Sequence, residues 1–410
     1  MSNAYCYRDN CRVCGSRDLV LVLDLGEMPL ANAFLTAEEL EAPEPSYPLR
    51  LYFCRSCTLL QLLDVVSPDV LFKDYDYVTS ASAPLAAHLK AFGRGLVRQF
   101  VHSSEELFVE IGGNDGTLLS AVADSARTLN IDPAENVSAL ARGLGIETLS
   151  KFFSDDVARE VLVSHGEARV VAATNVLAHI DDIVGVFKGI ARLIGERGVA
   201  AFEVHWVGNL VDGGGFDQIY HEHLCYYSMH ALSRLLAETG LTAFDVSLVP
   251  MHGESLRVFA SRSREPLPSV AALMERERKL GLDTETRYVQ FASAVAGNRE
   301  SIIKTLRELK AAGKRIIGYG APAKGNTLLN YCRIGPDTLE YLTDTTPQKQ
   351  GRFTPGMHIP VVAPERMHAR PPEYAILLAW NYKDAILKKE RALREQGMKF
   401  IIPVPDVEIV

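Results

Sequence analysis

Two CxxC pairs constrain the first part of this chain more than any other feature. Cys11 and Cys14 form the first pair (CRVC), and Cys54 and Cys57 form the second (CRSC). Thiolates are soft anionic donors, and four of them close a tetrahedral Zn²⁺ shell that leaves no position for an activated water. We therefore predict a structural zinc site, with a small subdomain folded between the two pairs.

Two other interpretations of these cysteines remain open. They can be reduced thiols scattered in a core, although two CxxC pairs in one short region argue against this. They can also form a thioredoxin-type redox site, but one pair would suffice and no βαβ pattern surrounds either. Of the other cysteines, Cys6 can be a spare ligand, and Cys225 and Cys332 are expected in the core.

Length and composition predict a globular protein of two or three domains. The chain has 410 residues, of which 47% are apolar and 23% charged. Its net charge of -8 gives no electrostatic footprint for nucleic acid or an anionic membrane. The N-terminus lacks the apolar core of a signal peptide, and no apolar run is long enough to span a bilayer. We expect a cytoplasmic protein whose cysteines are thiols or metal ligands.

A cofactor-binding pattern begins at residue 107. The apolar run LFVEI (107–111) predicts a buried strand, the segment GGNDG (112–116) a turn, and TLLSAVADSA a helix. Glycines in such a turn let the backbone approach a ligand, and a helix N-terminus offers free N–H groups. The predicted cofactor-binding residues here are Glu110, Gly112, Asn114 and Gly116.

The following strands extend this pattern. TLNID ends at Asp132, whose carboxylate can accept both ribose hydroxyls of an adenosine. VVAATNVLAHI predicts a strand that runs out at Asn175 and His179, and GVAAFEVHW a strand that ends near Glu203. Asp132 and Asn175 complete the predicted cofactor-binding residues. Because the turn reads EIGGNDG rather than GxGxxG, the pattern favours S-adenosylmethionine over NAD. A dinucleotide fold is the alternative.

A dense polar cluster follows three consecutive glycines. The segment FDQIYHEHLCYYS (216–228) contains Tyr220, Glu222 and His223, which can supply a phenol donor, an orienting carboxylate and a base. Histidine suits this role because its unperturbed pKa is about 6.5. The HEH triplet can instead belong to a metal site, but it lacks the HExxH spacing. Its histidines can also be ordinary surface or core residues.

The tyrosine-rich segment KDYDYVTSAS can close a pocket. It offers Tyr75 and Tyr77, followed by Thr79 and Ser80. The equally weighted alternative is a structural role in which the tyrosines pack two domains together.

Taken together, these motifs resemble the nucleotide-sugar C-3'-methyltransferases of deoxysugar biosynthesis. The resemblance spans nearly the whole chain in matching order. It rests on the CxxC pairs, YDYVTSAS, VEIGGNDGTLL, N-x3-H, FDQIYHEH, HGESLR, GYGAPAKG, DTTPQKQGRFTPGMHIPV and LLAWNY. Relatives often carry Ser or Cys where this chain has Gly113, and they are expected to vary at His221 and at 204–206.

The resemblance implies an α/β protein of three parts. These are a zinc-binding domain (1–75), a class I S-adenosylmethionine-dependent methyltransferase domain of Rossmann-like fold (76–262), and a second Rossmann-like domain (263–410). The implied substrate is a nucleotide-linked 4-keto-deoxyhexose that is methylated at C3 through an enolate, and the implied state is a monomer. His223 would be the base, with Tyr220 and Glu222 as partners, and Tyr77 and His179 would orient the sugar or bind the enolate oxygen.

The remaining sequence predicts the second α/β unit. A linker (263–269) precedes long helical stretches, and then strand and helix patterns alternate from RIIGYG to KFIIPV. Lys324 of the GYGAPAKG turn can contact substrate phosphates, or the turn can be only a tight connection. Methylation of oxygen or of another acceptor, an NAD-dependent oxidoreductase, and a non-catalytic zinc scaffold are the alternative functions.

Overall fold

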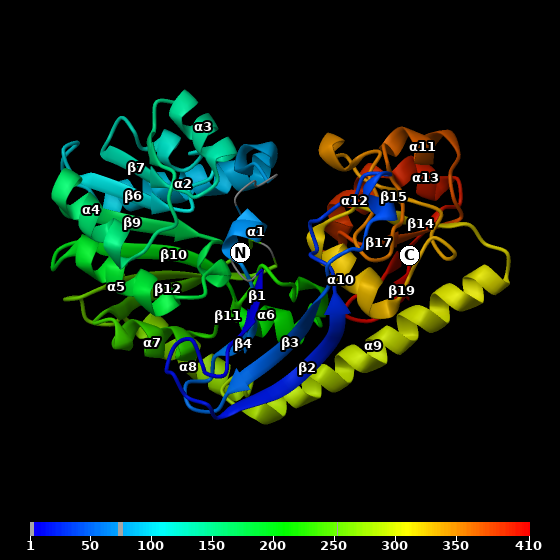
Figure 1. Ribbon diagram of the computed structural model, residues 1–410, viewed down its shortest axis with the longest axis horizontal. Helices are drawn as coiled ribbons and strands as arrows, with labels where there is room; N and C mark the ends of the chain where they lie inside the picture. The colour runs from blue at the N-terminus through cyan, green and yellow to red at the C-terminus, as the bar shows by residue number, and fades with distance from the viewer. Residues whose placement is uncertain (1–3, 73–76, 252) are drawn as a thin grey trace. The chain divides into compact units, whose positions relative to one another are not determined.

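The computed structural model describes residues 4–72, 77–251 and 253–410, which form two compact units (Figure 1). Of the described residues, those within 1–20, 53–207 and 224–284 form the first unit, and those within 21–52, 208–223 and 285–410 form the second. Both units are discontinuous in sequence. Residues 216–223 of the polar cluster belong to the second unit, together with the C-terminal part of the chain, whereas 224–228 belong to the first.

The first unit contains a seven-stranded sheet in the order β12-β13-β10-β9-β6-β7-β8. The five strands from β10 to β8 are parallel, whereas β13 is antiparallel to both β10 and β12. Their bounds are β6 Leu107–Ile111, β7 Arg127–Ile131, β8 Glu147–Leu149, β9 Ala168–Thr174, β10 Val199–His205, β12 Thr242–Val249 and β13 Ser255–Ser261. Apolar runs such as LFVEI, buried at every position, form the central strands because both faces of a parallel sheet are covered.

Helices cover both faces of this sheet (Figure 1). On one face, α2 packs with Ala201 in a single buried core. On the other, Phe187 of α5 meets the ring of Phe202 edge to face, since neighbouring strand residues point to opposite faces. The longer helices of this unit are α2 Ala83–Phe100, α3 Glu135–Gly143, α4 Asp155–His165, α5 Ile183–Ile194, α7 Met229–Glu238 and α8 Pro268–Lys279.

The predicted helix TLLSAVADSA is wrong. After the glycine turn the chain forms turns and a short 3₁₀ segment, η3 (Leu119–Ala121), before β7 begins. Side chains compete here for the backbone hydrogen bonds that a helix would need: Asp115 accepts from the backbone N–H of Thr117, and Ser120 donates to the carbonyl of Thr117. The segment directly after the glycine turn therefore does not supply a helix N-terminus to it.

The cysteine-rich segment forms short antiparallel pairings. Strand β1 (Tyr5–Tyr7) pairs with β5 (Asp64–Val66), and β4 (Leu60–Leu62) pairs with β11 (Cys225–Tyr226). β4 and β11 belong to a four-stranded sheet in the order β11-β4-β3-β2, with β2 at Leu19–Met28 and β3 at Tyr47–Cys54. Two short helical segments follow, α1 (Pro68–Phe72) and η2 (Thr79–Ala81).

The second unit contains a six-stranded sheet in the order β16-β15-β14-β17-β18-β19. All its pairings are parallel except the edge pair β18–β19, which confirms the predicted second parallel α/β unit. The strands are β14 Ile316–Tyr319, β15 Leu342–Thr343, β16 Val361–Val362, β17 Tyr374–Leu377, β18 Lys399–Ile402 and β19 Glu408–Ile409.

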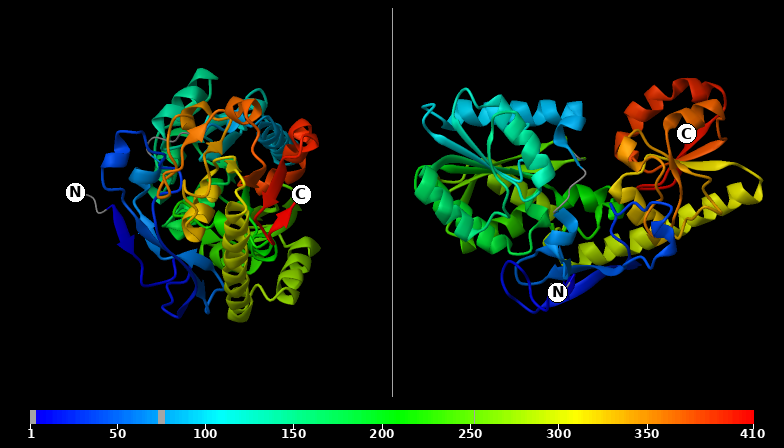
Figure 2. Two further views of the ribbon diagram at one scale, coloured as in Figure 1. Left: turned by 90° about the vertical axis from the view of Figure 1, so that its right-hand side faces the viewer. Right: turned by 45° about the horizontal axis from the view of Figure 1, so that its top comes forward.

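The helices of the second unit include α9 (Glu285–Ala311), which is continuous over 27 residues (Figure 2). The helical segment at 383–395 is interrupted at Glu390, a buried residue that accepts a hydrogen bond from Tyr319. The other helical segments are η1 Glu39–Glu41, α6 Val207–Asp212, η5 Phe216–Gln218, α10 Ala323–Cys332, η6 Pro347–Lys349, α11 Pro364–Ala369, η7 Trp380–Tyr382, α12 Lys383–Lys389 and α13 Arg391–Glu395. Among the helices of the described residues, none has the length and apolar character needed to span a membrane.

Candidate functional site

The four predicted zinc ligands converge in the first unit. The Sγ atoms of Cys11, Cys14, Cys54 and Cys57 all lie within 4.8 Å of one another. The two closest contacts are 3.5 Å between Cys11 and Cys57 and 3.6 Å between Cys14 and Cys54. Zn–S bonds of about 2.3 Å in a tetrahedron place sulfurs about 3.8 Å apart, so the cluster fits the ion.

The closeness of the thiols shifts the pKa values of Cys11 and Cys54 in opposite directions. Hydrogen bonds from the neighbouring thiols lower the pKa of Cys11, and the hydrogen bond to Cys11 raises the pKa of Cys54 to about 12. The protein alone therefore favours one thiolate at the expense of the others. A dication would hold all four sulfurs as thiolates and crosslink the two CxxC segments, which we call the first zinc knuckle (11–14) and the second zinc knuckle (54–57).

The glycine turn after β6 approaches its neighbours closely. Gly112 has a φ of 65°, and a Cβ atom there would lie 2.7 Å from Val176. A Cβ atom at Gly113 would lie 2.4 Å from Oδ1 of Asn130 and 2.8 Å from Oε2 of Glu110. The missing side chains leave a cradle at the carboxyl ends of β6, β7 and β9, where an open α/β sheet binds its ligand.

Asp132 fixes the shape of this cradle. Its Oδ2 accepts from the backbone N–H of Asn114 (2.9 Å), and its Oδ1 accepts from the N–H of Ala134 (3.0 Å). Each carboxylate oxygen keeps a further lone pair for a ribose hydroxyl. Burial raises the pKa of Asp132.

Three buried oxygens at this edge have no hydrogen-bond partner among the described residues. They are Oε2 of Glu110, Oδ1 of Asn130 and Oδ1 of Asn175. Buried acceptors are normally paired, so each is a place for a ligand donor. S-adenosylmethionine carries an ammonium group, two ribose hydroxyls and an adenine amine, and the residues therefore fit this cofactor.

Glu110 is the most perturbed carboxyl of the cradle. It is 1% exposed, and burial, together with the nearby Asp132 and Asp115, raises its pKa to about 8. Near neutral pH its carboxyl is therefore mostly protonated.

The segment that carries Tyr77 adjoins the same turn. Nδ2 of Asn114 donates to the carbonyl of Tyr77 (2.9 Å), and Oδ1 of Asn114 accepts from the N–H of Thr79 (3.0 Å). The Tyr77 side chain is 46% exposed. Tyr75, the other tyrosine singled out from the sequence, lies outside the described residues.

His179 ends the short turn η4 (Leu177–His179) that follows β9. Its ring stacks on Phe72 with the planes 7° apart and the centroids 5.3 Å apart. Burial, with the nearby His205, lowers the pKa of His179 to about 4. The imidazole is therefore neutral at physiological pH, with one N–H donor and one acceptor nitrogen.

His223 and Tyr220 form a hydrogen-bonded pair in the second unit. Nδ1 of His223 lies 3.1 Å from the carbonyl oxygen of Gln218, and Nε2 lies 2.9 Å from the hydroxyl of Tyr220. Because a carbonyl only accepts, Nδ1 carries the hydrogen of the neutral ring and Nε2 accepts from the phenol. The two rings also pack with centroids 4.1 Å apart.

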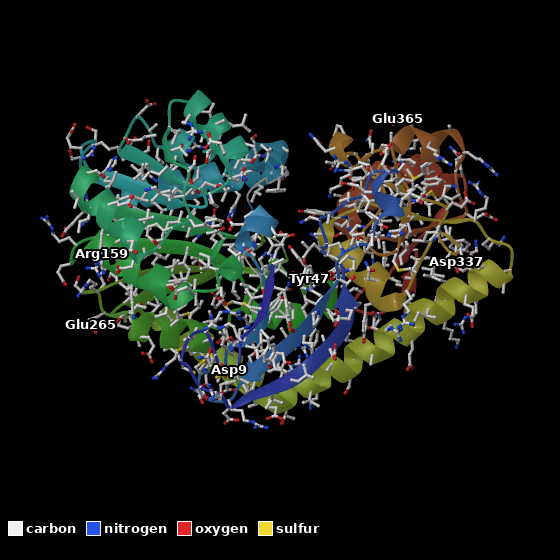
Figure 3. All side chains as sticks on the ribbon, viewed as in Figure 1. Asp9, Tyr47, Arg159, Glu265, Asp337 and Glu365 are labelled. Atoms are coloured by element: carbon white, nitrogen blue, oxygen red, sulfur yellow. The ribbon has the colours of Figure 1, made fainter. Side chains whose placement is uncertain are left out.

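Glu222 and His221 make contacts of a different kind. Oε1 of Glu222 accepts from Nδ2 of Asn32 at 2.6 Å, and burial raises the pKa of Glu222 to about 7. Nε2 of His221 lies 3.2 Å from the carbonyl oxygens of Tyr47, labelled in Figure 3, and of Pro48. The structure thus pairs Tyr220 with His223 and Glu222 with Asn32.

The GYGAPAKG turn joins β14 to α10, as the sequence indicated. Nζ of Lys324 lies 3.9 Å above the ring of Trp380, whose Nε1 donates to Asp217 at 2.6 Å. Burial lowers the pKa of Lys324 to about 8. Lys324 thus belongs to a buried cluster with an aromatic ring and a carboxylate nearby.

The sequence analysis did not identify three residues of the clusters described above, namely Asn32, Asn130 and Trp380. Asn130 precedes Asp132 by two positions in TLNID, so its period-two placement on the same face of the strand could have indicated it. Asn32 and Trp380 are distant in sequence from the residues that they contact, and no local signal points to them.

Comparisons with known proteins agree with this arrangement. Three family models match in succession: "Putative zinc binding domain" over 11–72, "Methyltransferase domain" over 86–246 and "C-methyltransferase C-terminal domain" over 250–405. The chain is also 36% identical over 406 residues to C-methyltransferase NovU of Streptomyces niveus, covering 98% of this chain and 97% of NovU.

Solved structures show weaker likenesses. Magnesium protoporphyrin IX methyltransferase of Synechocystis PCC 6803 with bound SAM is 13% identical with a TM-score of 0.33, covering 43% of this chain and 79% of that one. An S-adenosylmethionine-dependent methyltransferase of Clostridium acetobutylicum is 12% identical with a TM-score of 0.34, covering 46% and 94%.

The family assignment rests on the three family models and on the full-length relative. They confirm the expected class I methyltransferase fold, the zinc-binding domain and the cofactors S-adenosylmethionine and Zn²⁺. The chain is an S-adenosylmethionine-dependent C-methyltransferase, and it belongs to the sugar C-methyltransferase family with an N-terminal zinc-binding domain.

Proposed function

We propose that the chain methylates C3 of a nucleotide-linked 4-keto-deoxyhexose. The hydrogen on C3 lies α to the C4 ketone, so a base can remove it and leave an enolate. The enolate carbon then attacks the sulfonium methyl, the methyl–sulfur bond breaks, and S-adenosylhomocysteine leaves. The observation that supports this function is the His223–Tyr220 pair, in which a ring nitrogen with a lone pair meets a phenol donor.

In this proposal His223 removes the C3 proton at Nε2. Hydrogen bonding of Nδ1 to the Gln218 carbonyl orients the ring for that role. The Tyr220 hydroxyl would leave Nε2 as the substrate binds and donate to the developing enolate oxygen. Glu222 would hold the segment that carries His223 in place through its hydrogen bond with Asn32.

The remaining roles are proposed for residues of the first unit. Glu110, Asn114, Asp132 and Asn175, with the glycines at 112 and 116, would bind the methyl donor. His179 and Tyr77 would orient the sugar. The segments 1–75, 76–262 and 263–410 would serve as zinc-binding, donor-binding and second Rossmann-like domains of a monomer.

The test is turnover with S-adenosylmethionine and a panel of thymidine- and guanosine-linked 4-keto-deoxysugars, followed by NMR of the product. A new methyl group on C3 supports the proposal. With S-adenosylhomocysteine bound, C3 should also exchange its hydrogen with solvent deuterium, and His223→Asn should abolish this exchange. A methyl group on oxygen, or no C3 exchange, would refute it.

A further inference from the structure

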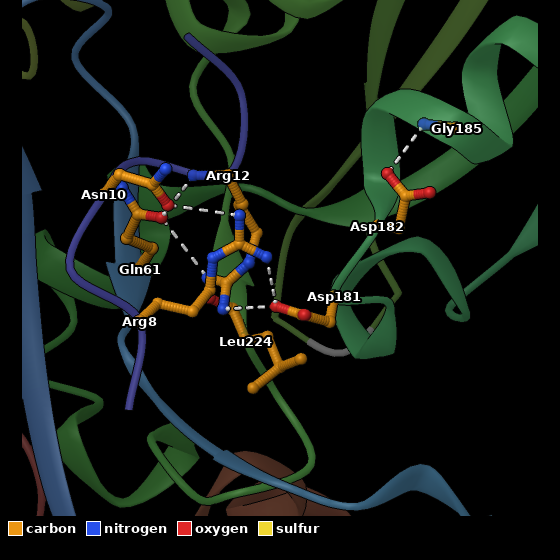
Figure 4. Close-up of polar contacts among 8 residues, drawn as sticks. All are labelled: Arg8, Asn10, Arg12, Gln61, Asp181, Asp182, Gly185 and Leu224. Atoms are coloured by element: carbon orange, nitrogen blue, oxygen red, sulfur yellow. Dashed lines mark hydrogen bonds and ion pairs between the residues drawn. The ribbon is translucent and has the colours of Figure 1, made fainter. Parts of the chain in front are cut away.

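The zinc knuckle contains a buried cation, Arg12, between the ligands Cys11 and Cys14. The Arg12 side chain is 0% exposed. Its Nη1 donates to the carbonyl oxygen of Leu224 at 2.8 Å and to Oε1 of Gln61 at 3.3 Å, and its Nη2 donates to Oδ1 of Asp181 at 3.2 Å (Figure 4). One planar group thus joins three segments that are far apart in sequence.

Leu224, which directly follows His223 in the chain, is held from several sides. Its carbonyl oxygen accepts from Arg12 and from the N–H of Leu62 at 3.0 Å. Its own N–H donates to the carbonyl of Ala178 at 2.7 Å. The next residues enter β11, which pairs with β4 close to the second knuckle.

Asp181 ties the same arginine to the turn that bears His179. Oδ1 of Asp181 accepts from Arg12 and also from Nη1 of Arg8 at 2.9 Å (Figure 4). Two further hydrogen bonds hold this turn. The carbonyl of Ala178 accepts from the N–H of Leu224, and the carbonyl of Leu177 accepts from the hydroxyl of Tyr227 at 2.9 Å. Leu224, which directly follows His223, and Asp181, which lies shortly after His179, therefore both accept hydrogen bonds from the guanidinium of Arg12.

Arginine suits this position for a physical reason. A buried cation is costly unless its hydrogen bonds are made, and a guanidinium can reach three acceptors in different directions within its plane. A shorter, tetrahedral ammonium cannot reproduce that fork. Four thiolates around Zn²⁺ carry a net charge of about -2, which favours a cation between two of the ligands.

We propose that Arg12 is a positioning residue for the reaction. Through the Leu224 carbonyl and Asp181 it fixes the backbone that directly follows His223 and the turn that ends at His179. This inference rests on the proposed function for the roles of the histidines, but the linkage itself can be measured without a substrate.

The second knuckle provides a matched control. Arg55 occupies the same place in CRSC as Arg12 does in CRVC. Its side chain is 49% exposed, and its Nη1 pairs with the exposed Asp18 at 3.1 Å. Arg55→Met therefore removes an arginine from a zinc knuckle without removing the buried fork.

The experiment compares Arg12→Lys, Arg12→Met, Asp181→Asn and Arg55→Met in the full-length zinc protein. Zinc content and S-adenosylhomocysteine affinity are measured first, followed by amide hydrogen exchange of 177–182 and 222–227. Kinetics use whichever keto-sugar the wild type methylates. For the Arg12 variants we expect zinc and cofactor affinity to be retained, exchange of both segments to accelerate about tenfold, and kcat to fall about tenfold with KM unchanged.

Asp181→Asn should reproduce the change at 177–182, which keeps the test decisive even if an Arg12 variant does not fold. Arg55→Met should match the wild type throughout. Unchanged exchange in the Arg12 and Asp181 variants, or equal effects in Arg55→Met, would overturn the inference. If the wild type methylates no keto-sugar, the proposed function fails, while the exchange data still decide whether Arg12 holds these segments.

Discussion

The hydroxyl of Tyr220 lies 2.9 Å from Nε2 of His223, while Nδ1 of that histidine lies 3.1 Å from a backbone carbonyl. The backbone contact selects one tautomer, so the lone pair of the ring is directed at the phenol. This arrangement distinguishes two adjacent roles. In the proposed function, the imidazole would accept the substrate proton and the phenol would donate a hydrogen bond to the enolate oxygen.

Substitution of the two residues should separate those roles. We expect His223→Asn to lower kcat by about 10³-fold or more because the general base is lost, while cofactor affinity stays unchanged. Tyr220→Phe should lower kcat by about 10²-fold because a donor to the enolate oxygen is lost. Rapid-quench turnover and calorimetric titration with S-adenosylmethionine measure both effects. Full activity of Tyr220→Phe would mean that the phenol only packs against the ring.

Glu222 should make the protein less stable as the pH rises. Burial raises its folded-state pKa to about 7 from its ordinary value of 4.5, so between these values the folded protein holds a proton that the unfolded chain has released. Stability should therefore fall from about pH 4.5 to 7, by up to about 3 kcal/mol. Glu222→Gln keeps an oxygen for Asn32 and should remove this pH dependence.

Thermal unfolding of wild type and Glu222→Gln at pH 5 and pH 8 tests the prediction. The variant should gain stability relative to the wild type mainly at pH 8. Glu254→Gln, which changes a carboxyl whose side chain is 35% exposed, serves as the control. Equal differences at both pH values would contradict the raised pKa of Glu222.

Much of the fold could be predicted because its signals are local. The run LFVEI, its glycine turn and Asp132 lie within 26 residues and identify one Rossmann-like unit. The two CxxC pairs likewise identify the zinc ligands, whose convergence the structure confirms. The failed helix after the turn has a local cause as well, namely the side chains of Asp115 and Ser120, but their competition with the backbone depends on geometry that periodicity does not report.

The contacts of the candidate site were harder to predict because they join distant segments. Glu222 was expected beside His223, yet its hydrogen bond comes from Asn32, 190 positions earlier. Arg12 contacts Leu224 across 212 positions. A sequence gives residue types and spacings, whereas these pairings depend on how discontinuous segments fold into one unit.

Loss of the metal should unfold the knuckles rather than stop the chemistry directly. We expect one Zn²⁺ per chain, and Cys57→Ser should lose it, since Cys57 is buried in the cluster. The thermal midpoint should then fall by several degrees because metal binding contributes to folding. Cys6→Ser is the control, because Cys6 is exposed and outside the four-cysteine group. Metal analysis and calorimetry measure the zinc content and the thermal midpoint. Equal zinc contents in the two variants would contradict the prediction.

Cofactor binding should release a proton from Glu110. Its pKa of about 8 means that the free protein holds this carboxyl protonated at neutral pH, with Oε2 lacking a partner among the described residues. The ammonium of S-adenosylmethionine favours the ionised form, so affinity should rise with pH up to about 8. Titrations at pH 7 in phosphate and in Tris should give enthalpies that differ by the buffers' ionisation heats. In Glu110→Gln this difference should vanish and affinity should fall about tenfold; buffer-independent enthalpy in the wild type would show that the carboxyl keeps its proton and that its ligand partner is an uncharged group.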